Sequence, residues 1–425
     1  MPLRILHIST RLILGGSQEN TVLSCEGQAR LGHDVHLAFG PIFGPEGSHL
    51  SRVHAFNTRC AQGNEPAKPI TTHEIPTLVR EVNPLKDRKA RRALLELIER
   101  TRPDIVHTHS SKAGVLGRLA AFDAYERAVR GVGGSRAHRP AVVHTIHGPP
   151  FMPAPRNPVA KLKTSLKNKV YELAERHAAS RCHAIVSVAD AMTEQFLARN
   201  IGTPSLYTTV RSGMETEAFL TPRPGETGKD ARRELGLAPT DFVIGTVARL
   251  AEHKGHDDLL DALAGTLRER RHWKLLWVGD GWWKDRLLRR VAQLGLEHQV
   301  VLTGLVSPER VPTMIRAMDV LAHPSAREGL PRTVPQALLC AVVPVAYDVD
   351  GTREVCIDQR TGRLVPAGNV QALADAIRWL HDHPGERRDM GERGREMCQT
   401  MFSTQGMVRG LEEVYAEALR KAERR

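Results

Sequence analysis

The sequence is poor in cysteine, in aromatic residues and in long apolar stretches. Only six cysteines occur in 425 residues, and none form a CxxC pair, so the sequence indicates neither a disulfide nor a zinc framework. Aromatic residues make up 4% of the chain, which is sparse for surfaces that stack nucleic-acid bases. No apolar run is long enough for a membrane span, and the first is too short for a signal peptide. We expect a cytoplasmic protein with reduced thiols and no nucleic-acid partner.

Acidic residues are also fewer than basic ones. The chain has 48 aspartates and glutamates but 60 lysines and arginines, for a formal net charge of +12. Such an excess favours anionic partners, such as nucleotide-sugars, nucleic acid or acidic lipid. For most of these basic residues we prefer a simpler explanation, that they are solvated charges spread over the surface.

The opening strand–helix–strand unit lacks a dinucleotide fingerprint. Residues 3–8 and 35–39 are predicted strands, and a glycine turn at 14–17 leads into the helix between them. GxGxxG is absent, and no acidic residue ends the second strand to hold a ribose hydroxyl. This disfavours a nicotinamide-dependent enzyme.

Predicted strands alternate with helices in both halves of the chain. Further strands are expected at residues 104–107, 141–146, 183–188, 242–247, 274–278, 300–303, 319–322 and 342–347. The alternation predicts parallel sheets with binding loops at the carboxyl ends of the strands, and the length suits two domains. Residues 40–90 are rich in proline, and we predict mostly loop there.

The most specific pattern lies in residues 318–355. A buried strand is followed by a loop with Glu328-Gly329 and by a helix that cannot begin much before Thr333, because Pro335 is tolerated only in a first helical turn. A helix N-terminus beside a flexible glycine suits an anionic ligand. Gln336 stands eight positions after Glu328.

This spacing resembles the Glu-x7-Glu signature of retaining GT-B glycosyltransferases of the family 4 type, which often reads E-G-L-P before the helix. Here the second glutamate is replaced by Gln336. The resemblance continues in segments R-L-x-x-x-K-G at 249–255, Gly279-Asp280-Gly281, Thr303-Gly304 and Gly351-Thr352-x-Glu354-Val355.

The resemblance implies two Rossmann-like, doubly wound α/β domains facing each other across a cleft. Residues 1–210 would form the acceptor-side domain, 211–400 the nucleotide-sugar donor domain, and 401–425 a helix that crosses back to the first domain. The implied reaction moves a sugar, with retention, from a nucleotide-diphosphate-sugar to a sugar or lipid-linked hydroxyl acceptor in polysaccharide, lipopolysaccharide or glycolipid synthesis. It needs no metal and no other cofactor. The alternatives are another GT-B nucleotide-sugar enzyme (an epimerase or phosphorylase) and, because of Gln336, a non-catalytic sugar-nucleotide binding protein.

The resemblance also implies roles for particular residues. Arg249 and Lys254 would stabilise charge on the leaving diphosphate. Glu328 would hold sugar hydroxyls, Gln336 the ribose, and His147 would lie beside the donor sugar as a fourth catalytic residue with Arg249, Lys254 and Glu328. The implied donor-binding residues are Gly15, Gly16, Arg249, Lys254, Gly279, Glu328, Gly329, Leu330 and Gln336.

Two possible metal motifs are discounted. His107 and His109 share a strand face only if the strand geometry persists past its end, and no third ligand suggests itself. Asp348-Val349-Asp350 looks like the metal motif of the GT-A fold, but it falls in the family's non-metal turn. We interpret it as local turn chemistry.

Residues 158–178 are predicted to form a basic amphipathic helix. Its apolar stripe is Val159, Leu162, Leu166, Val170 and Leu173, flanked by Lys163, Lys167 and Lys169. Two interpretations, which do not exclude each other, remain open. The stripe faces the core while the lysines reach water, or the helix docks on an anionic membrane surface, the inner face of the plasma membrane, as would suit a lipid-linked acceptor.

Overall fold

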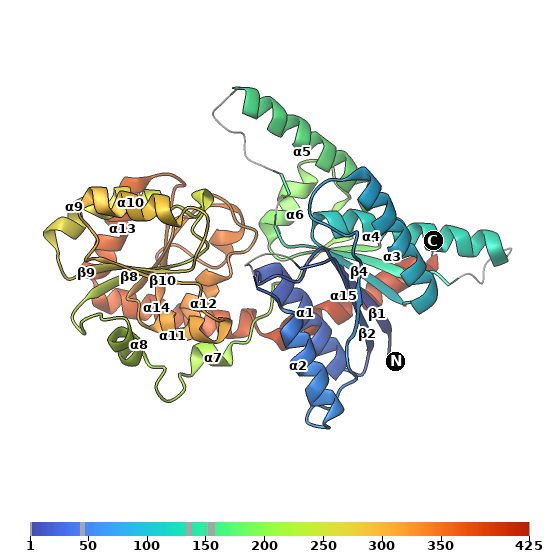
Figure 1. The fold of residues 1–425 in the computed structure, drawn as a ribbon, viewed down its shortest axis with the longest axis horizontal. Coiled ribbons are helices and arrows are strands. Elements are labelled where there is room, and N and C mark those ends of the chain that lie inside the picture. The colour runs from blue at the N-terminus through green and yellow to red at the C-terminus, as the bar shows by residue number, and fades with distance from the viewer. Residues whose placement is uncertain (1, 43–46, 133–137, 149, 152–157, 425) are drawn as a thin grey trace. The chain divides into compact units, whose positions relative to one another are not determined.

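The computed structural model describes residues 2–42, 47–132, 138–148, 150–151 and 158–424. The chain divides into two compact units (Figure 1). The N-terminal unit consists of Met1–Met214 with Thr404–Arg425, and the C-terminal unit consists of Glu215–Ser403. Each unit has a parallel sheet with helices packed against it. The predicted pair of Rossmann-like α/β domains is confirmed.

The sheet of the N-terminal unit has the strand order β3-β2-β1-β4-β5-β6-β7, and its neighbouring strands are parallel. The strands are β1 (Arg4–Ser9), β2 (Asp34–Phe39), β3 (Thr71–Glu74), β4 (Ile105–His109), β5 (Ala141–Ile146), β6 (Ala184–Ser187) and β7 (Tyr207–Thr209). The helices are α1 (Gly16–Arg30), α2 (Leu50–Ala61), α3 (Pro84–Thr101), α4 (Ser111–Val132), α5 (Pro158–Ala179), α6 (Asp190–Leu197) and α15 (Thr404–Arg424). The strand order changes direction between β1 and β4.

The last helix, α15, is part of the core of the N-terminal unit. Met407, Leu411, Val414 and Ala418 recur at helical spacing and are buried in one cluster with side chains of β1, β4, β5 and β6. Strands β4 and β5 are buried along their whole length, as expected for a parallel sheet covered on both faces.

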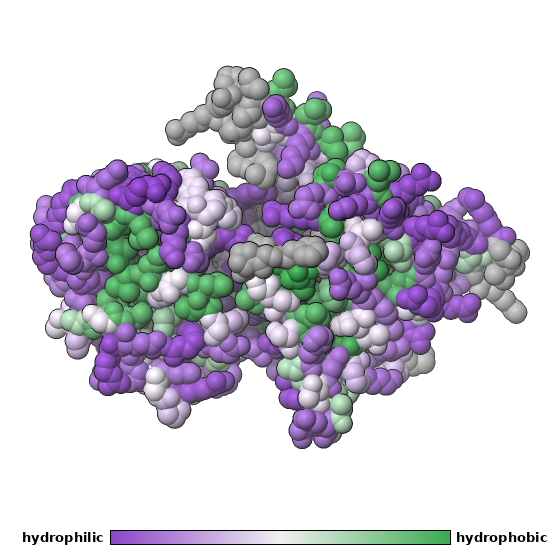
Figure 2. Space-filling view, viewed as in Figure 1, coloured by the Kyte–Doolittle hydropathy of each residue, from purple (hydrophilic) through white to green (hydrophobic). Residues whose placement is uncertain are grey.

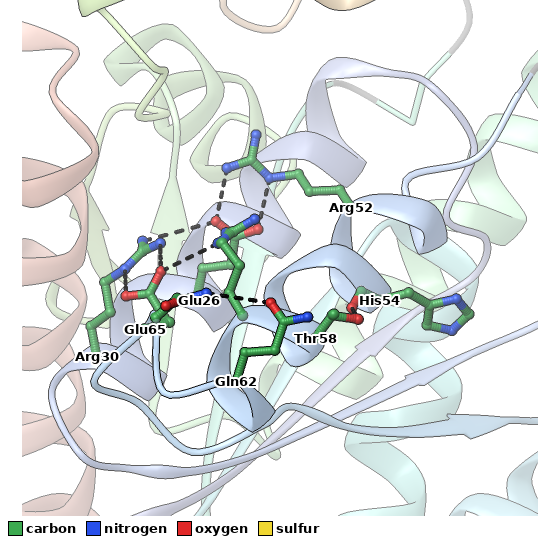
Figure 3. A network of polar contacts seen from close by, with 9 residues as sticks. Glu26, Arg30, Arg52, His54, Thr58, Gln62 and Glu65 are labelled. Carbon is green, nitrogen blue, oxygen red and sulfur yellow. Dashed lines mark hydrogen bonds and ion pairs between the residues drawn. The ribbon is translucent and has the colours of Figure 1, made fainter.

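The segment predicted as loop between residues 40 and 90 contains helix α2, strand β3 and the start of α3. Helix α2 and the segment after it are each tied to α1 by an ion pair (Figure 3). Arg52 donates two hydrogen bonds, of 2.7 and 2.8 Å, to the buried carboxylate of Glu26, and Arg30 does the same to Glu65 at 3.0 and 2.9 Å. The loop prediction was therefore wrong for α2. This helix is held in place in part by Glu26 of α1, which is distant from it in the sequence.

The sheet of the C-terminal unit has the order β10-β9-β8-β11-β12-β13. Its strands are β8 (Phe242–Val247), β9 (Trp273–Val278), β10 (Val300–Gly304), β11 (Val320–His323), β12 (Val343–Tyr347) and β13 (Arg363–Val365). Its α-helices are α7 (Glu217–Leu220), α8 (Gly228–Glu234), α9 (His256–Glu269), α10 (Lys284–Leu294), α11 (Val311–Arg316), α12 (Thr333–Leu339), α13 (Val370–Asp382) and α14 (Pro384–Met401). Chain order reverses between β8 and β11, the position at which open α/β sheets bind ligands. In the described part of either unit, no helix is long and apolar enough to cross a membrane.

Candidate active site

Two loops meet at the switch point of the C-terminal sheet, one after β8 and the other after β11. The carbonyl oxygen of His253 accepts hydrogen bonds from the backbone N–H of Ala326 at 2.8 Å and from the hydroxyl of Ser325 at 3.1 Å. Gly255 has φ +72°, and a Cβ there would lie 1.9 Å from the carbonyl oxygen of Pro324. Only glycine allows this close approach, so Gly255 is the residue that lets the two loops come together.

The contact between these loops places Lys254 against Glu328. The Lys254 Nζ lies 2.6 Å from Glu328 Oε1, and His323 Nε2 lies 3.2 Å from the same oxygen. Burial alone raises the pKa of Glu328, but the charge of Lys254 and the hydrogen bond and charge of His323 outweigh it. The pKa therefore lies well below its usual value, and the carboxylate is ionised at neutral pH. The Glu328 backbone N–H donates to Asp350 Oδ2 at 2.7 Å, which fixes the loop.

Other cations surround this pair. Arg249 follows β8, is exposed and has its guanidinium carbon 5.6 Å from the ring centroid of Trp282. The pKa of His253 is lowered first by burial, then by the charge of Lys254, and also by Arg327 and Arg249, and these effects together outweigh the charge of Glu328, which raises it. The loops after β8 and β11 therefore share a positive electrostatic environment that suits a phosphate group.

The predicted glycine loops form the framework behind these cations. Gly279 has φ +140°, and a Cβ there would lie 2.1 Å from the carbonyl oxygen of Ala248. Its N–H donates to the carbonyl oxygen of Gly304 at 3.0 Å. Leu250 N–H donates to the Asp280 carbonyl oxygen at 3.0 Å. These contacts support the segment that carries Arg249.

Helix α12 begins at Thr333, as Pro335 requires, and carries the half-buried Gln336. Gly329 is tied to the next loop because its carbonyl oxygen accepts from Gly351 N–H at 3.0 Å, and Leu330 is buried. The helix is only seven residues long, so its dipole is a weaker source of anion binding than the sequence pattern suggested. Lys254, Arg249 and Arg327 carry the positive charge of these loops.

Each carboxylate of the Asp348-Val349-Asp350 motif bonds within its own turn or to the adjoining loop. Asp348 accepts hydrogen bonds from Arg353 at 3.0 and 2.8 Å, while Asp350 accepts from Glu328 N–H. These contacts agree with the predicted role in turn formation.

In the N-terminal unit, His147 follows β5 and is half-buried. Its Nε2 lies 3.1 Å from Nδ1 of His109. Gly15 caps α1 and Gly16 is its first residue, so both lie at the same end of the sheet as His147.

The expectation that His107 and His109 have no third possible ligand nearby was wrong. His7 of β1 joins them, and the three offer ring nitrogens within 4.8 Å of one another. His7 and His107 are paired in register across β1 and β4. A single predicted strand could not show this, because the contact depends on strand order.

His323 is a further site residue that the sequence analysis missed. It ends β11 and contacts Glu328. Its place at the carboxyl end of a predicted strand, five positions before Glu328, was an available signal.

Both units are Rossmann-like α/β domains, and the C-terminal unit carries an ion pair and further cations at its switch point. The family model "Glycosyl transferase 4-like domain" matches residues 15–213, and the model "Glycosyl transferases group 1" matches residues 228–397. The two models between them cover most of both units. The chain belongs to the GT-B glycosyltransferases built from these two domains.

Similar proteins include a diphosphoundecaprenol-sugar galactosyltransferase and a capsular polysaccharide biosynthesis glycosyltransferase. The UDP-Gal:alpha-D-GlcNAc-diphosphoundecaprenol alpha-1,3-galactosyltransferase of Escherichia coli is 27% identical over 307 residues, which is 71% of this chain and 73% of the relative. The capsular polysaccharide biosynthesis glycosyltransferase CapM of Staphylococcus aureus is 24% identical over 358 residues, 83% of this chain and 86% of CapM. The crystal structure of Anabaena HepE with UDP and glucose has a TM-score of 0.75 at 20% identity, covering 97% of this chain and 99% of HepE. This likeness shows the fold.

Proposed function

We propose that this glycosyltransferase moves a sugar from a nucleotide-diphosphate-sugar to a hydroxyl of a sugar or lipid-linked acceptor, with retention at the anomeric carbon and without a metal ion. The observation that carries the proposal is the Lys254–Glu328 pair beside Arg249 at the switch point of the C-terminal sheet. The E. coli relative is named for a UDP-sugar donor and a diphosphate-lipid-linked acceptor. HepE was solved with UDP-glucose. Both support this class of substrates.

The geometry of the C-terminal unit suggests how bond breaking is assisted. Negative charge grows on the diphosphate as the glycosidic bond breaks, and fixed cations stabilise that charge most strongly in the transition state. Lys254 is already held by Glu328 at 2.6 Å, so little reorganisation is needed. The ionised Glu328 keeps an acceptor for sugar hydroxyls.

Retention is part of the proposal because the family resemblance implies it. In the mechanism that we propose, the acceptor attacks from the side on which the diphosphate departs, and a departing phosphate oxygen takes the acceptor proton. Gln336 would hold the ribose through its amide, which can both donate and accept.

The test is a transfer assay with nucleotide-sugars and a diphosphate-lipid-linked sugar acceptor. We expect a product whose anomeric configuration, read by NMR coupling constants, equals that of the donor, and activity that survives EDTA. An inverted product would contradict retention, and activity lost in EDTA and restored by a divalent cation would contradict metal independence. A change in the sugar of the donor without any acceptor would favour the epimerase alternative.

Helix α5 supports a second part of the proposal, docking on an anionic membrane. Its apolar stripe is exposed: the exposed fractions are 73%, 65%, 60% and 63% for Leu162, Leu166, Val170 and Leu173. The core-facing interpretation is therefore wrong for these four residues; the side chain of Val159 lies outside the described residues. The helix extends from the rest of its unit (Figure 1), and apolar and polar side chains lie next to each other on its surface (Figure 2).

We propose that this stripe enters the interface of an anionic bilayer while the neighbouring lysines contact lipid headgroups. Each near-surface lysine contributes about 1 kcal/mol. Flotation with vesicles rich in phosphatidylglycerol should fall when Lys163, Lys167 and Lys169 become glutamine. The matched control makes the same change in net charge on exposed residues of α3: Lys86, Arg88 and Lys89. Equal loss in both variants would show a non-specific charge effect and would contradict docking through α5.

A further inference from the structure

A cavity of about 410 Å³ lies in the C-terminal unit, at the amino ends of β11 and β12. Its walls come from the start of α8, from the residues between α11 and β11 and between α12 and β12, and from the start of α14. The proposed donor site is at the carboxyl ends of these parallel strands, so the cavity lies at the opposite edge of the sheet. Its volume is in the range of small-molecule binding sites. The residues in its walls therefore indicate what it could bind.

Three arginines line the cavity: Arg316 at the end of α11, and Arg387 and Arg388 near the start of α14. Among the described residues of the lining, Asp319 is the one acidic side chain. Its Oδ2 accepts a hydrogen bond from Arg232 Nη2 at 2.7 Å, so much of its charge is balanced by a residue outside the lining. Positive charge therefore predominates in the cavity.

Arg387 is half-buried in this positive environment. Its guanidinium carbon lies 5.2 Å from the ring centroid of Phe242, a contact that helps to fix the side chain. The pKa of Arg387 is lowered first by burial. Asp319, whose Oδ1 lies 3.7 Å from Arg387 Nη2, raises it, but the charges of Arg232 and Arg388 lower it again. An anion bound beside Arg387 would relieve this excess of positive charge.

Arg316 has a guanidinium nitrogen whose hydrogen-bonding capacity is unused. Its Nη2 donates to the carbonyl oxygens of Ala218 at 2.5 Å and Phe219 at 3.1 Å. Its buried Nη1 has no hydrogen-bond partner among the described residues, although buried donors are usually hydrogen-bonded. Burial raises the pKa of the neighbouring Cys340 thiol to about 12, and the charges of Arg316 and Arg395 act against that rise. An anion in the cavity would bring acceptor oxygens to this part of the wall.

The rest of the lining is largely apolar and includes Met318, Ala341, Val342 and Pro384. Arginine recognises phosphate through paired, charge-assisted hydrogen bonds. Apolar side chains next to the arginines suit the organic group of a phosphate ester. The chemistry of the lining therefore favours a small phosphorylated molecule over a cation or an uncharged sugar.

We propose that this cavity is a second ligand site, separate from the donor site, and that it binds a small molecule carrying a phosphate group. Arg316, Arg387 and Arg388 supply hydrogen bonds to the phosphate, and the apolar wall contacts the group to which the phosphate is attached. The proposal does not depend on sugar transfer, because every residue that carries it lies at the amino ends of the strands.

The test is calorimetric titration of the full-length protein with inorganic phosphate and with glucose 6-phosphate, at an ionic strength held constant with sodium chloride. We expect saturable binding of both, and tighter binding of glucose 6-phosphate because of the apolar wall. Arg388→Gln removes an exposed charge and should weaken binding roughly tenfold or more, the worth of a hydrogen bond to a charged group. Arg387→Gln should have an effect of similar size.

The matched control is Arg289→Gln, which removes an exposed arginine of α10 in the same unit and should leave both affinities unchanged. The effect of Arg388→Gln should also be found in an Arg249→Gln background, in which the proposed donor site has lost a cation. Equal affinity for the two probes would retain the phosphate site and reject the contact with the apolar wall.

Four results would overturn the proposal. They are no saturable binding of either probe, unchanged affinity in Arg388→Gln, an equal loss in Arg289→Gln, and binding that Arg249→Gln alone abolishes, which would place the phosphate at the donor site. Because Arg388 is exposed, its replacement tests the site even if Arg387→Gln fails to fold.

Discussion

Replacing Lys254 with methionine separates its structural from its catalytic contribution. The substitution keeps most of the apolar stem and removes the charge, so Glu328 loses the Lys254 ion pair and keeps its contact with His323. Removing one partner of a buried ion pair costs about 3–5 kcal/mol. We expect the lower end, about 3 kcal/mol, because the two side chains retain 20% and 13% exposure. At about 2–4 °C per kcal/mol, the C-terminal unit should melt roughly 6–12 °C lower.

The effect on turnover should be larger and independent of stability. If Lys254 acts on the leaving diphosphate, its loss should lower kcat roughly 10²- to 10³-fold, with a much smaller effect on donor binding. The double variant Lys254→Met/Glu328→Gln removes the unpaired carboxylate, so it should recover much of the melting temperature but none of the turnover.

Calorimetry and steady-state kinetics with a saturating acceptor measure these two effects. The exposed Lys229 of the same unit provides the control, and Lys229→Met should change neither quantity. A folded Lys254→Met protein with wild-type kcat would refute the leaving-group role. Recovery of turnover in the double variant would show that Lys254 acts only by balancing Glu328.

Three further predictions concern the same loops. Gln336→Leu should raise the donor KM roughly tenfold because the ribose hydroxyls lose their partner, while Gln336→Glu leaves activity intact or lowers KM modestly; a wild-type KM in Gln336→Leu would show that this residue does not touch the ribose. Because the pKa of Glu328 is lower in the folded protein, its ion pair stabilises fully above the ordinary carboxyl pKa of about 4.3 and loses this effect as the pH falls below it. Melting curves should show that Glu328→Gln reduces this acid-induced loss of stability, and identical pH profiles would contradict it. Asp350→Ala should lower kcat/KM about fivefold because Glu328 N–H loses its acceptor, and unchanged kinetics would show that this bond does not position the loop.

The sequence predicted the sheets well because strand–helix alternation is a local signal. The strand expected at 319–322 lies at Val320–His323, and the helix begins at Thr333. Helix α2 was missed because its segment lies among prolines, and because its bond to Glu26 joins residues 26 positions apart.

The sequence was sufficient to predict which loops form the site. Parallel strands bring their carboxyl ends to one edge, so Lys254 and Glu328 could be assigned to the same region of the C-terminal unit. Their direct contact could not be predicted, since it depends on the close approach that Gly255 permits. The contact of His7 with His107 and His109 also could not be predicted, because it depends on strand order. Periodicity identified the apolar face of α5 but could not show that this face is exposed.

The most direct test of the central claim is calorimetric titration of the protein with nucleoside diphosphates and with the corresponding nucleosides. If the cations at the switch point hold the diphosphate, one diphosphate of the series should bind much more tightly than its nucleoside. That difference should shrink in the Lys254→Met/Arg249→Gln variant. Equal affinity of the diphosphate and its nucleoside, or a difference that survives the loss of both cations, would contradict the account.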